Sequence, residues 1–305
     1  MIEFTSAENQ ISRPTAVQDF RLHRPRPGAR IKRLPPAPVF AITSGKGGVG
    51  KTNVVANLAA ALAQRNKRVM VIDADLGLAN LDLFLGVKPT HTLADFFSGA
   101  AALEEIIISN PNGILLLPGA SGVQEMTALR HEQKAALLTE LDALTHAMDL
   151  VLVDTASGIS DAVTYFTTAA QEIVVVVTPE PSSMTDAYAL VKVLASTHGQ
   201  KRFWILANSV SGAEEARRLF DTLSRTALRF LNASLDLLGW IPRDAQLMRS
   251  VARAQMVVMN APDSPSAHSF VALAERLLQL ATAGVKLKGN VQFFFRRMLE
   301  GRRGA

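Results

Sequence analysis

Cysteine is absent from this 305-residue sequence, and tryptophan and tyrosine occur only twice each. Without cysteine the chain can form no disulfide framework, no thiolate zinc site and no cysteine-held iron–sulfur centre. The purest hydrophobic run, IVVVV at 173–177, is as long as a strand and far shorter than the roughly 20 residues that cross a bilayer. The first residues, MIEFTSAENQ, are too polar for the apolar core of a secretory signal. These absences favour a cytoplasmic protein.

The net charge of +5 is unevenly distributed along the chain. Residues 1–38 contain seven basic side chains and three acidic ones, and residues 285–305 contain six and one. The segment between them is therefore mildly acidic. This distribution favours an anionic surface that meets the two ends, and it argues against nucleic-acid binding by residues 39–284.

Composition divides the chain into three parts. Residues 1–38 carry six prolines and no sustained periodicity, which indicates a basic, flexible arm. Residues 39–284 alternate short apolar runs with longer amphipathic stretches, including 52–65 and 127–147. Because the runs are short, β-branched and bounded by turn residues or charges, we predict a doubly wound α/β fold with a mainly parallel sheet. The predicted strands are VFAIT (39–43), VMVID (69–73), ILLLP (114–118), LVLVD (150–154), IVVVV (173–177) and FWILA (203–207).

The motif GKGGVGKT at 45–52 lies between the first predicted strand and the first predicted helix. It fits the phosphate-binding pattern G-x-x-x-x-G-K-[ST], in which backbone N–H groups and a helix N-terminus surround phosphate oxygens. Lys51 would reach the β- and γ-phosphates, and Thr52 would bind Mg²⁺. A tight turn without a ligand is the alternative, but the flanking strand and helix favour a nucleotide. The predicted binding residues are Gly45, Gly47, Gly48, Val49, Gly50, Lys51 and Thr52.

Carboxylates follow two other predicted strands. Asp73 and Asp75 come at the end of VMVID, and Asp154 ends LVLVD, with Gly158 shortly after as a candidate switch residue. In a parallel sheet these positions share the ligand-binding edge with the glycine-rich loop. An aspartate at a strand end also commonly caps a helix or forms a turn. Their order after the loop favours a magnesium site built from Asp73, Asp154 and Thr52.

Three segments together carry a resemblance: KGGVGKT with its second lysine Lys46, DADLGLANLD at 73–82, and DTASGIS at 154–160. They resemble the deviant Walker A ATPases, the group of MinD and ParA proteins. In that group the extra lysine crosses to the partner subunit's nucleotide in an ATP-bound dimer. The resemblance therefore implies a slow ATP hydrolase that uses ATP and Mg²⁺ and depends on dimerisation and partners. The catalytic residues it implies are Lys46, Lys51 and Asp75, with Asp75 orienting the attacking water.

The same resemblance implies an adenine-binding region late in the domain. Asn208, which follows FWILA, and the turn GWIPRD at 239–244 are similar to adenine-contacting segments of the group. Within the turn, Pro242 and Asp244 are the implied contacts.

Within the group, the chain is most similar to the flagellar-number regulators of the FlhG and FleN type. The similarity rests on Ala79 in DADLGLANLD, on DTASGIS, and on NVQFFFRRMLE near the end. It implies an ATP-dependent homodimer that binds an FlhF-type GTPase, components of the flagellar C-ring or a flagellar transcription activator. The D-Q-A-x-x-L element of many such proteins is absent from residues 1–38, which leaves stimulation of that GTPase open. A MinD-type regulator of cell division, a ParA-type partitioning ATPase and a non-hydrolysing regulator remain alternatives.

Residues 285–305 are predicted to form a basic amphipathic tail. Its apolar stripe lies beside arginines, a pattern typical of a helix in a membrane surface. We expect it to attach the protein peripherally to an anionic membrane at the inner face of the cell, and docking on the body of the protein is the alternative. The stripe consists of Val291, Phe294, Phe295, Met298 and Leu299.

Overall fold

A computed structural model describes residues 37–75, 79–119 and 147–282, together with positions 137, 140, 141 and 144. These residues form one eight-stranded sheet in the order β3-β4-β2-β5-β1-β6-β7-β8. All neighbouring strands are parallel except β3 and β4. The strands are β1 (Val39–Ser44), β2 (Val69–Ala74), β3 (Ile108–Ser109), β4 (Leu115–Leu117), β5 (Leu150–Ser157), β6 (Glu172–Val177), β7 (Arg202–Val210) and β8 (Ser234–Pro242).

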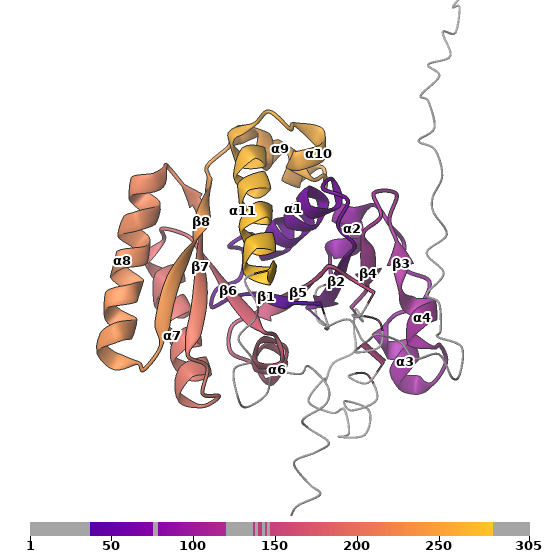
Figure 1. Cartoon of the computed structure of the whole chain (residues 1–305), viewed down its shortest axis with the longest axis horizontal. Coiled ribbons are helices and arrows are strands. Elements are labelled where there is room, and N and C mark those ends of the chain that lie inside the picture. The colour runs from indigo at the N-terminus through magenta and orange to yellow at the C-terminus, as the bar shows by residue number, and fades with distance from the viewer. Residues whose placement is uncertain are drawn as a thin grey trace, which may run out of the picture.

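Helices cover both faces of this sheet. Figure 1 shows α1, α10 and α11 on one side of it and α6 on the other. The first group comprises α1 (Lys51–Ala63), α2 (Leu81–Leu85), α9 (Ala245–Ala252), α10 (Val257–Asn260) and α11 (Pro265–Thr282). The second comprises α3 (Leu93–Ser98), α4 (Leu103–Ile106), α6 (Asp161–Ala169), α7 (Pro181–Ser196) and α8 (Ala213–Phe230).

The central strand β1 explains why two layers form. Its side chains alternate, so that Phe40 and Ile42 pack with α1 and α11, whereas Val39 and Ala41 pack into the opposite layer. Residues on both faces are apolar and buried, which is why the strand appears in sequence as an uninterrupted hydrophobic run. The predicted doubly wound, mainly parallel fold is confirmed.

Helix α11 closes the first layer against the edge strand β8. Its start is joined to the end of β8, where Ser266 N–H donates to Asp244 Oδ2 at 3.1 Å. Further along, Leu273 lies so close to Gly239 that a Cβ there would come within 2.8 Å of its Cδ2. Helix α11 therefore runs antiparallel to β8, from the edge where the strands end to the edge where they begin.

All six predicted strands are confirmed, but two others were missed. Strand β3 is only two residues long, and β8 mixes polar and apolar residues because its position at the edge leaves it partly exposed. Residues 239–242, predicted as part of a turn, are the end of β8. The first predicted helix lies at 51–63, whereas most of 127–147 and the arm and tail predicted at 1–38 and 285–305 lie outside the described residues. Among the described residues, no helix has the length and hydropathy to span a bilayer.

Candidate functional site

The glycine-rich loop connects β1 to α1 at the edge where the parallel strands end. Gly48 and Gly50 have φ angles of 76° and 90°, in the left-handed region that glycine adopts without strain. Gly50 is the N-cap residue of α1, and no side chain of the described residues caps this helix start through a hydrogen bond. The first N–H groups of a 13-residue helix are thus available to an anion. This arrangement is what phosphate binding requires.

Three neighbouring segments hold the loop in place. A Cβ at Gly45 would lie 2.1 Å from the main-chain carbon of Asp186, so only glycine allows the loop to pack on α7. The Asn208 side-chain amide donates to the Val49 carbonyl at 2.7 Å. Gly158 N–H donates to the Ser44 carbonyl at 2.9 Å, which joins the loop after β5 to the start of the phosphate loop. The loop is therefore shaped before any ligand arrives.

Two buried carboxylates lie beside this loop. Asp73 and Asp154 are register partners on the neighbouring strands β2 and β5, and they are 2% and 1% exposed. Asp73 accepts hydrogen bonds from the N–H groups of Asp75 and Leu81, at 3.1 and 3.3 Å. Both oxygens of Asp154, in contrast, are buried and receive no hydrogen bond of full geometry in the described structure, although the Thr52 hydroxyl lies close enough to lower the pKa of this carboxyl. The predicted proximity of these two aspartates is thus observed.

Burial perturbs both acids strongly. It raises the pKa of Asp154 to about 7, although the positive charge of Lys51 and the Thr52 hydroxyl oppose the rise and the charge of Asp75 adds to it. Burial and the charge of Asp154 raise the pKa of Asp73 to about 7 as well, against the two backbone hydrogen bonds. Lys51, itself only 8% exposed, is the cation that partly compensates Asp154. A site with two raised carboxyl pKa values and one lysine favours an additional cation.

The residues present fit Mg²⁺. Mg²⁺ prefers hard oxygen ligands and usually binds through one or two carboxylates together with phosphates and water. Asp154 offers two unsatisfied buried oxygens, and Thr52 and Asp73 are its neighbours in this region. No cluster of three or more potential metal-ligating side chains forms a second candidate within the part of the chain that the structure describes.

The two predicted lysines have different surroundings. Lys51 is buried next to Asp154, whereas the Lys46 ammonium leaves the loop and donates to Glu180 Oε2 at 2.6 Å and Ser182 Oγ at 2.9 Å. Asp75 is half-buried, and its charge is close enough to raise the pKa of Asp154. The loop, Lys51, Asp73, Asp75 and Asp154 therefore gather at one edge of the sheet.

The residues predicted to contact adenine are occupied within the protein. Besides holding Val49, the Asn208 side chain accepts a hydrogen bond from Ser209 N–H at 2.9 Å. Asp244 is the N-cap residue of α9, where it accepts from Gln246 N–H at 2.8 Å, and it also binds Ser266. Pro242 is the last residue of β8 and pairs with Val210. These three lie near the same sheet edge, but Asn208 and Asp244 have clear structural roles there.

Glu180, Ser182 and the Asp186 main chain were not predicted as parts of this site. They belong to the start of α7, which follows β6, and β6 is the direct neighbour of β1 in the sheet. In a parallel sheet, the segment after a neighbouring strand reaches the same edge. The sequence PEPSS after IVVVV could have indicated them, but only with the strand order in hand.

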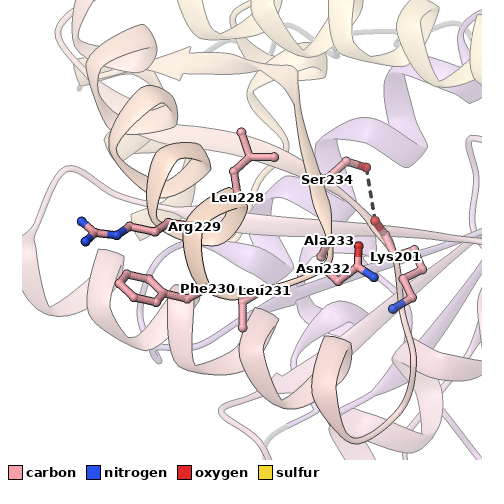
Figure 2. Close-up of a pocket in the computed structure, with 8 residues that line it drawn as sticks. All are labelled: Lys201, Leu228, Arg229, Phe230, Leu231, Asn232, Ala233 and Ser234. Carbon is pink, nitrogen blue, oxygen red and sulfur yellow. Dashed lines mark hydrogen bonds between the residues drawn. The ribbon is translucent and has the colours of Figure 1, made fainter.

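A second concavity lies far from this site. It has a volume of about 700 Å³ and is formed by the end of α8 and the residues that precede β7 and begin β8 (Figure 2). Leu228 and Phe230 are largely exposed there. Because β7 and β8 begin at this edge, the groove and the phosphate loop lie at opposite edges of the sheet. It is lined by Lys201, Leu228, Arg229, Phe230, Leu231, Asn232, Ala233 and Ser234.

Comparison with known families decides what kind of domain this is. Residues 40–257 match the family model described as the CobQ/CobB/MinD/ParA nucleotide binding domain. The chain belongs to this family. The match covers the phosphate loop, all three aspartates and the segment before α10, so the predicted membership of the MinD/ParA group is confirmed.

Two relatives match most of this chain, and the second is named for a flagellar role. The chain is 42% identical over 265 residues to the antiactivator FleN of Pseudomonas aeruginosa, covering 87% of this chain and 94% of the relative. It is 35% identical to the flagellum site-determining protein YlxH of Helicobacter pylori, covering 86% of this chain and 89% of the relative.

Solved MinD structures share the fold. The cell division ATPase MinD of Pyrococcus furiosus is 29% identical, with a TM-score of 0.66, and covers 80% of this chain and 100% of its own. MinD of Pyrococcus horikoshii, solved in complex with Mg-ADP, is 28% identical with a TM-score of 0.66, over 81% of this chain and 98% of its own. The predicted nucleotide and magnesium cofactors agree with the ligand of that relative.

Because Asp154 is buried and its pKa is raised, we predict that it makes the free energy of unfolding depend on pH, and that Asp154→Asn removes this contribution. Between about pH 4 and 7 the unfolded carboxylate is ionised while the folded one retains its proton, because its pKa is raised from 3.8 to about 7. The unfolded state then binds fewer protons, so the free energy of unfolding falls as pH rises through this window, by at most about 1.4 kcal/mol per pH unit, and levels off above it.

Urea unfolding of the nucleotide-free protein with EDTA, from pH 5 to 8, measures this effect. The wild type should lose stability relative to Asp154→Asn as pH rises. Asp221→Asn, an exposed change on α8, is the matched control and should follow the wild type. Parallel curves for the wild type and Asp154→Asn would contradict the prediction.

Proposed function

We propose that this chain is an ATP-dependent switch that dimerises with ATP and regulates the number or placement of flagella. The flagellar part is supported by the similarity to FleN and YlxH over most of the length of each protein. The observation that carries the switch is the second lysine of the phosphate loop. Lys46 directs its ammonium away from the phosphate site that Lys51 serves.

In this proposal the nucleotide is ATP with Mg²⁺. The N–H groups of residues 45–52 and the Lys51 ammonium would bind its phosphates, and Thr52, Asp73 and Asp154 would hold the metal directly or through water. Magnesium, when bound, supplies charge neutralisation across the β- and γ-phosphates. Its charge would also relieve the cost of ionising Asp73 and Asp154 side by side.

Hydrolysis would depend on two further residues. Asp75 would orient and deprotonate the attacking water, because it is a half-buried carboxylate at the same edge as the phosphate loop. Lys46 would contact the phosphates bound by a second copy of the chain, where an additional cation stabilises the charge that develops in the transition state. Supplying that cation from the partner couples hydrolysis to dimerisation.

The dimer would act on flagellar proteins in the cytoplasm while it is attached to the inner face of the cell membrane. Its partner would be a transcription activator, a C-ring component or an FlhF-type GTPase, as the names of the relatives suggest for the first of these. Residues 285–305 would bind the inner face of the cell membrane peripherally, through apolar side chains and arginines.

Replacing the second lysine tests the switch. Lys46→Ala should abolish ATP-induced dimers while the monomer still binds nucleotide through Lys51. Multi-angle light scattering measures the dimer, and calorimetry measures nucleotide binding. Lys192→Ala, at an exposed position on the same helix as Ser182, is the control and should dimerise normally. A normal ATP dimer of the Lys46 variant would refute the proposal.

Removing the water-orienting carboxylate should have the opposite effect on the dimer. Asp75→Ala should retain the ATP dimer and slow hydrolysis by roughly two orders of magnitude or more, because a general base is lost while ground-state contacts remain. Phosphate release in single-turnover experiments measures this, with Asp221→Ala as the control. Turnover near that of the wild type would show that another residue orients the attacking water.

Membrane binding should require ATP. A single amphipathic tail anchors weakly, and a dimer presents two, which raises avidity by roughly 10²- to 10⁴-fold where both engage. Sedimentation with anionic liposomes should therefore retain the wild type with ATP but not with ADP. Neither Lys46→Ala nor a chain that ends at Gly289 should sediment with the liposomes. Equal sedimentation with ADP and ATP would contradict a nucleotide-gated anchor.

A further inference from the structure

The Lys46 ammonium makes two polar contacts within its own chain. It donates to Glu180 Oε2 at 2.6 Å and to Ser182 Oγ at 2.9 Å. Glu180 is the N-cap residue of α7, and Ser182 lies in the first turn of that helix. The Lys46 side chain is 35% exposed and that of Glu180 is 62% exposed, so the pair lies at the surface and within reach of another molecule.

The backbone around Lys46 favours this contact. Gly45 packs directly on the α7 main chain at Asp186. Ser44 Oγ donates to the Lys46 carbonyl at 2.8 Å, which restrains the peptide that carries the lysine. Loop and helix are thus in contact at the residue before Lys46, and the side chain of Lys46 reaches Glu180 from there.

The positive charge of Lys46 lies beside the start of helix α7, where a cation is not expected. The N-terminus of a helix carries partial positive charge, which disfavours a cation beside it. Glu180 offsets that effect, because its carboxylate is paired with the ammonium beside the helix start. Without this carboxylate, only the neutral Ser182 hydroxyl would hold Lys46 against α7. With it, the lysine has a counter-charge that competes with any other anion.

We propose that Glu180 and Ser182 are positioning residues that hold Lys46 within the monomer, and that ATP-driven dimerisation must break this contact. The inference rests on the proposed function, because the competing anion is the phosphate group of ATP bound by a second copy of the chain. One ammonium cannot satisfy both. A dimer contains two such lysines, so the dissociation constant depends on the square of the fraction of chains in which Lys46 is released.

Glu180→Gln tests the contact, because it removes the charge and keeps the shape. Ion pairs as exposed as this one shift a population by roughly 2- to 5-fold, so the dimer dissociation constant at saturating ATP should fall by roughly 4- to 25-fold. Sedimentation equilibrium with a non-hydrolysable ATP analogue measures it. ADP affinity of the monomer should change by less than about twofold, which separates positioning of Lys46 from damage to the nucleotide site.

Glu214→Gln is the matched control, since Glu214 is likewise an exposed glutamate near the start of a helix, paired with Arg218 on α8. It should behave like the wild type. Ser182→Ala should strengthen the dimer less than Glu180→Gln, because it removes a neutral acceptor.

A second measurement tests the contact between Lys46 and Glu180 in the monomer, where dimerisation plays no part. In the nucleotide-free monomer, mass spectrometry should show acylation of the Lys46 amine accelerated about 2- to 5-fold by Glu180→Gln, with buried Lys51 unchanged. If the wild type dimerises and Glu180→Gln dimerises equally or less readily, the inference is wrong while the proposed function stands. If the wild type stays monomeric with ATP, the proposed function is wrong, and the competition between the two anions is wrong with it.

Discussion

Two carboxylates buried side by side, with one buried lysine near Asp154, constrain the whole nucleotide edge of this protein. Asp73 and Asp154 are register partners on adjacent strands, and among the described residues no hydrogen bond of full geometry reaches either oxygen of Asp154, which has only the Thr52 hydroxyl nearby. Burying such groups costs free energy unless a cation or hydrogen bonds compensate them. The protein supplies only part of that compensation, through Lys51 and the backbone around Asp73. The remainder of the site is arranged for a ligand that brings positive charge with it.

A rigid frame makes such an unsatisfied pair tolerable. Strand β1 is apolar on both faces and lies between β5 and β6, so its end cannot shift without disturbing both helix layers. The glycine-rich loop is attached to this frame by α7 at Gly45, by Asn208 at Val49 and by Gly158 at Ser44. The three attachments come from helix α7 after β6, from β7 itself and from the residue that follows β5. Signals about an occupied phosphate site can therefore reach several parts of the domain through direct contacts.

The sequence predicted most of this frame, and it failed where information depended on strand order. Buried strands such as LVLVD were recognisable because both of their faces are apolar. Strand β8 was missed because an edge strand is partly exposed and looks like a turn when it ends in GWIP. The adenine contacts of Asn208 and Asp244, implied by the resemblance, stay a prediction; in the structure the two side chains bind the loop and begin α9. Glu180 has no motif at all, and it reaches Lys46 only because β6 lies next to β1.

Helix α11 gives this domain a direction. It starts at Ser266, bonded to Asp244 at the nucleotide edge, and runs antiparallel to β8 for 18 residues, which is about 27 Å. Thr282, the last described residue of α11, therefore lies on the side opposite the phosphate loop. In two copies that face each other across their nucleotides, the two Thr282 ends would then lie on the outer sides of the pair, far from the shared nucleotide edges.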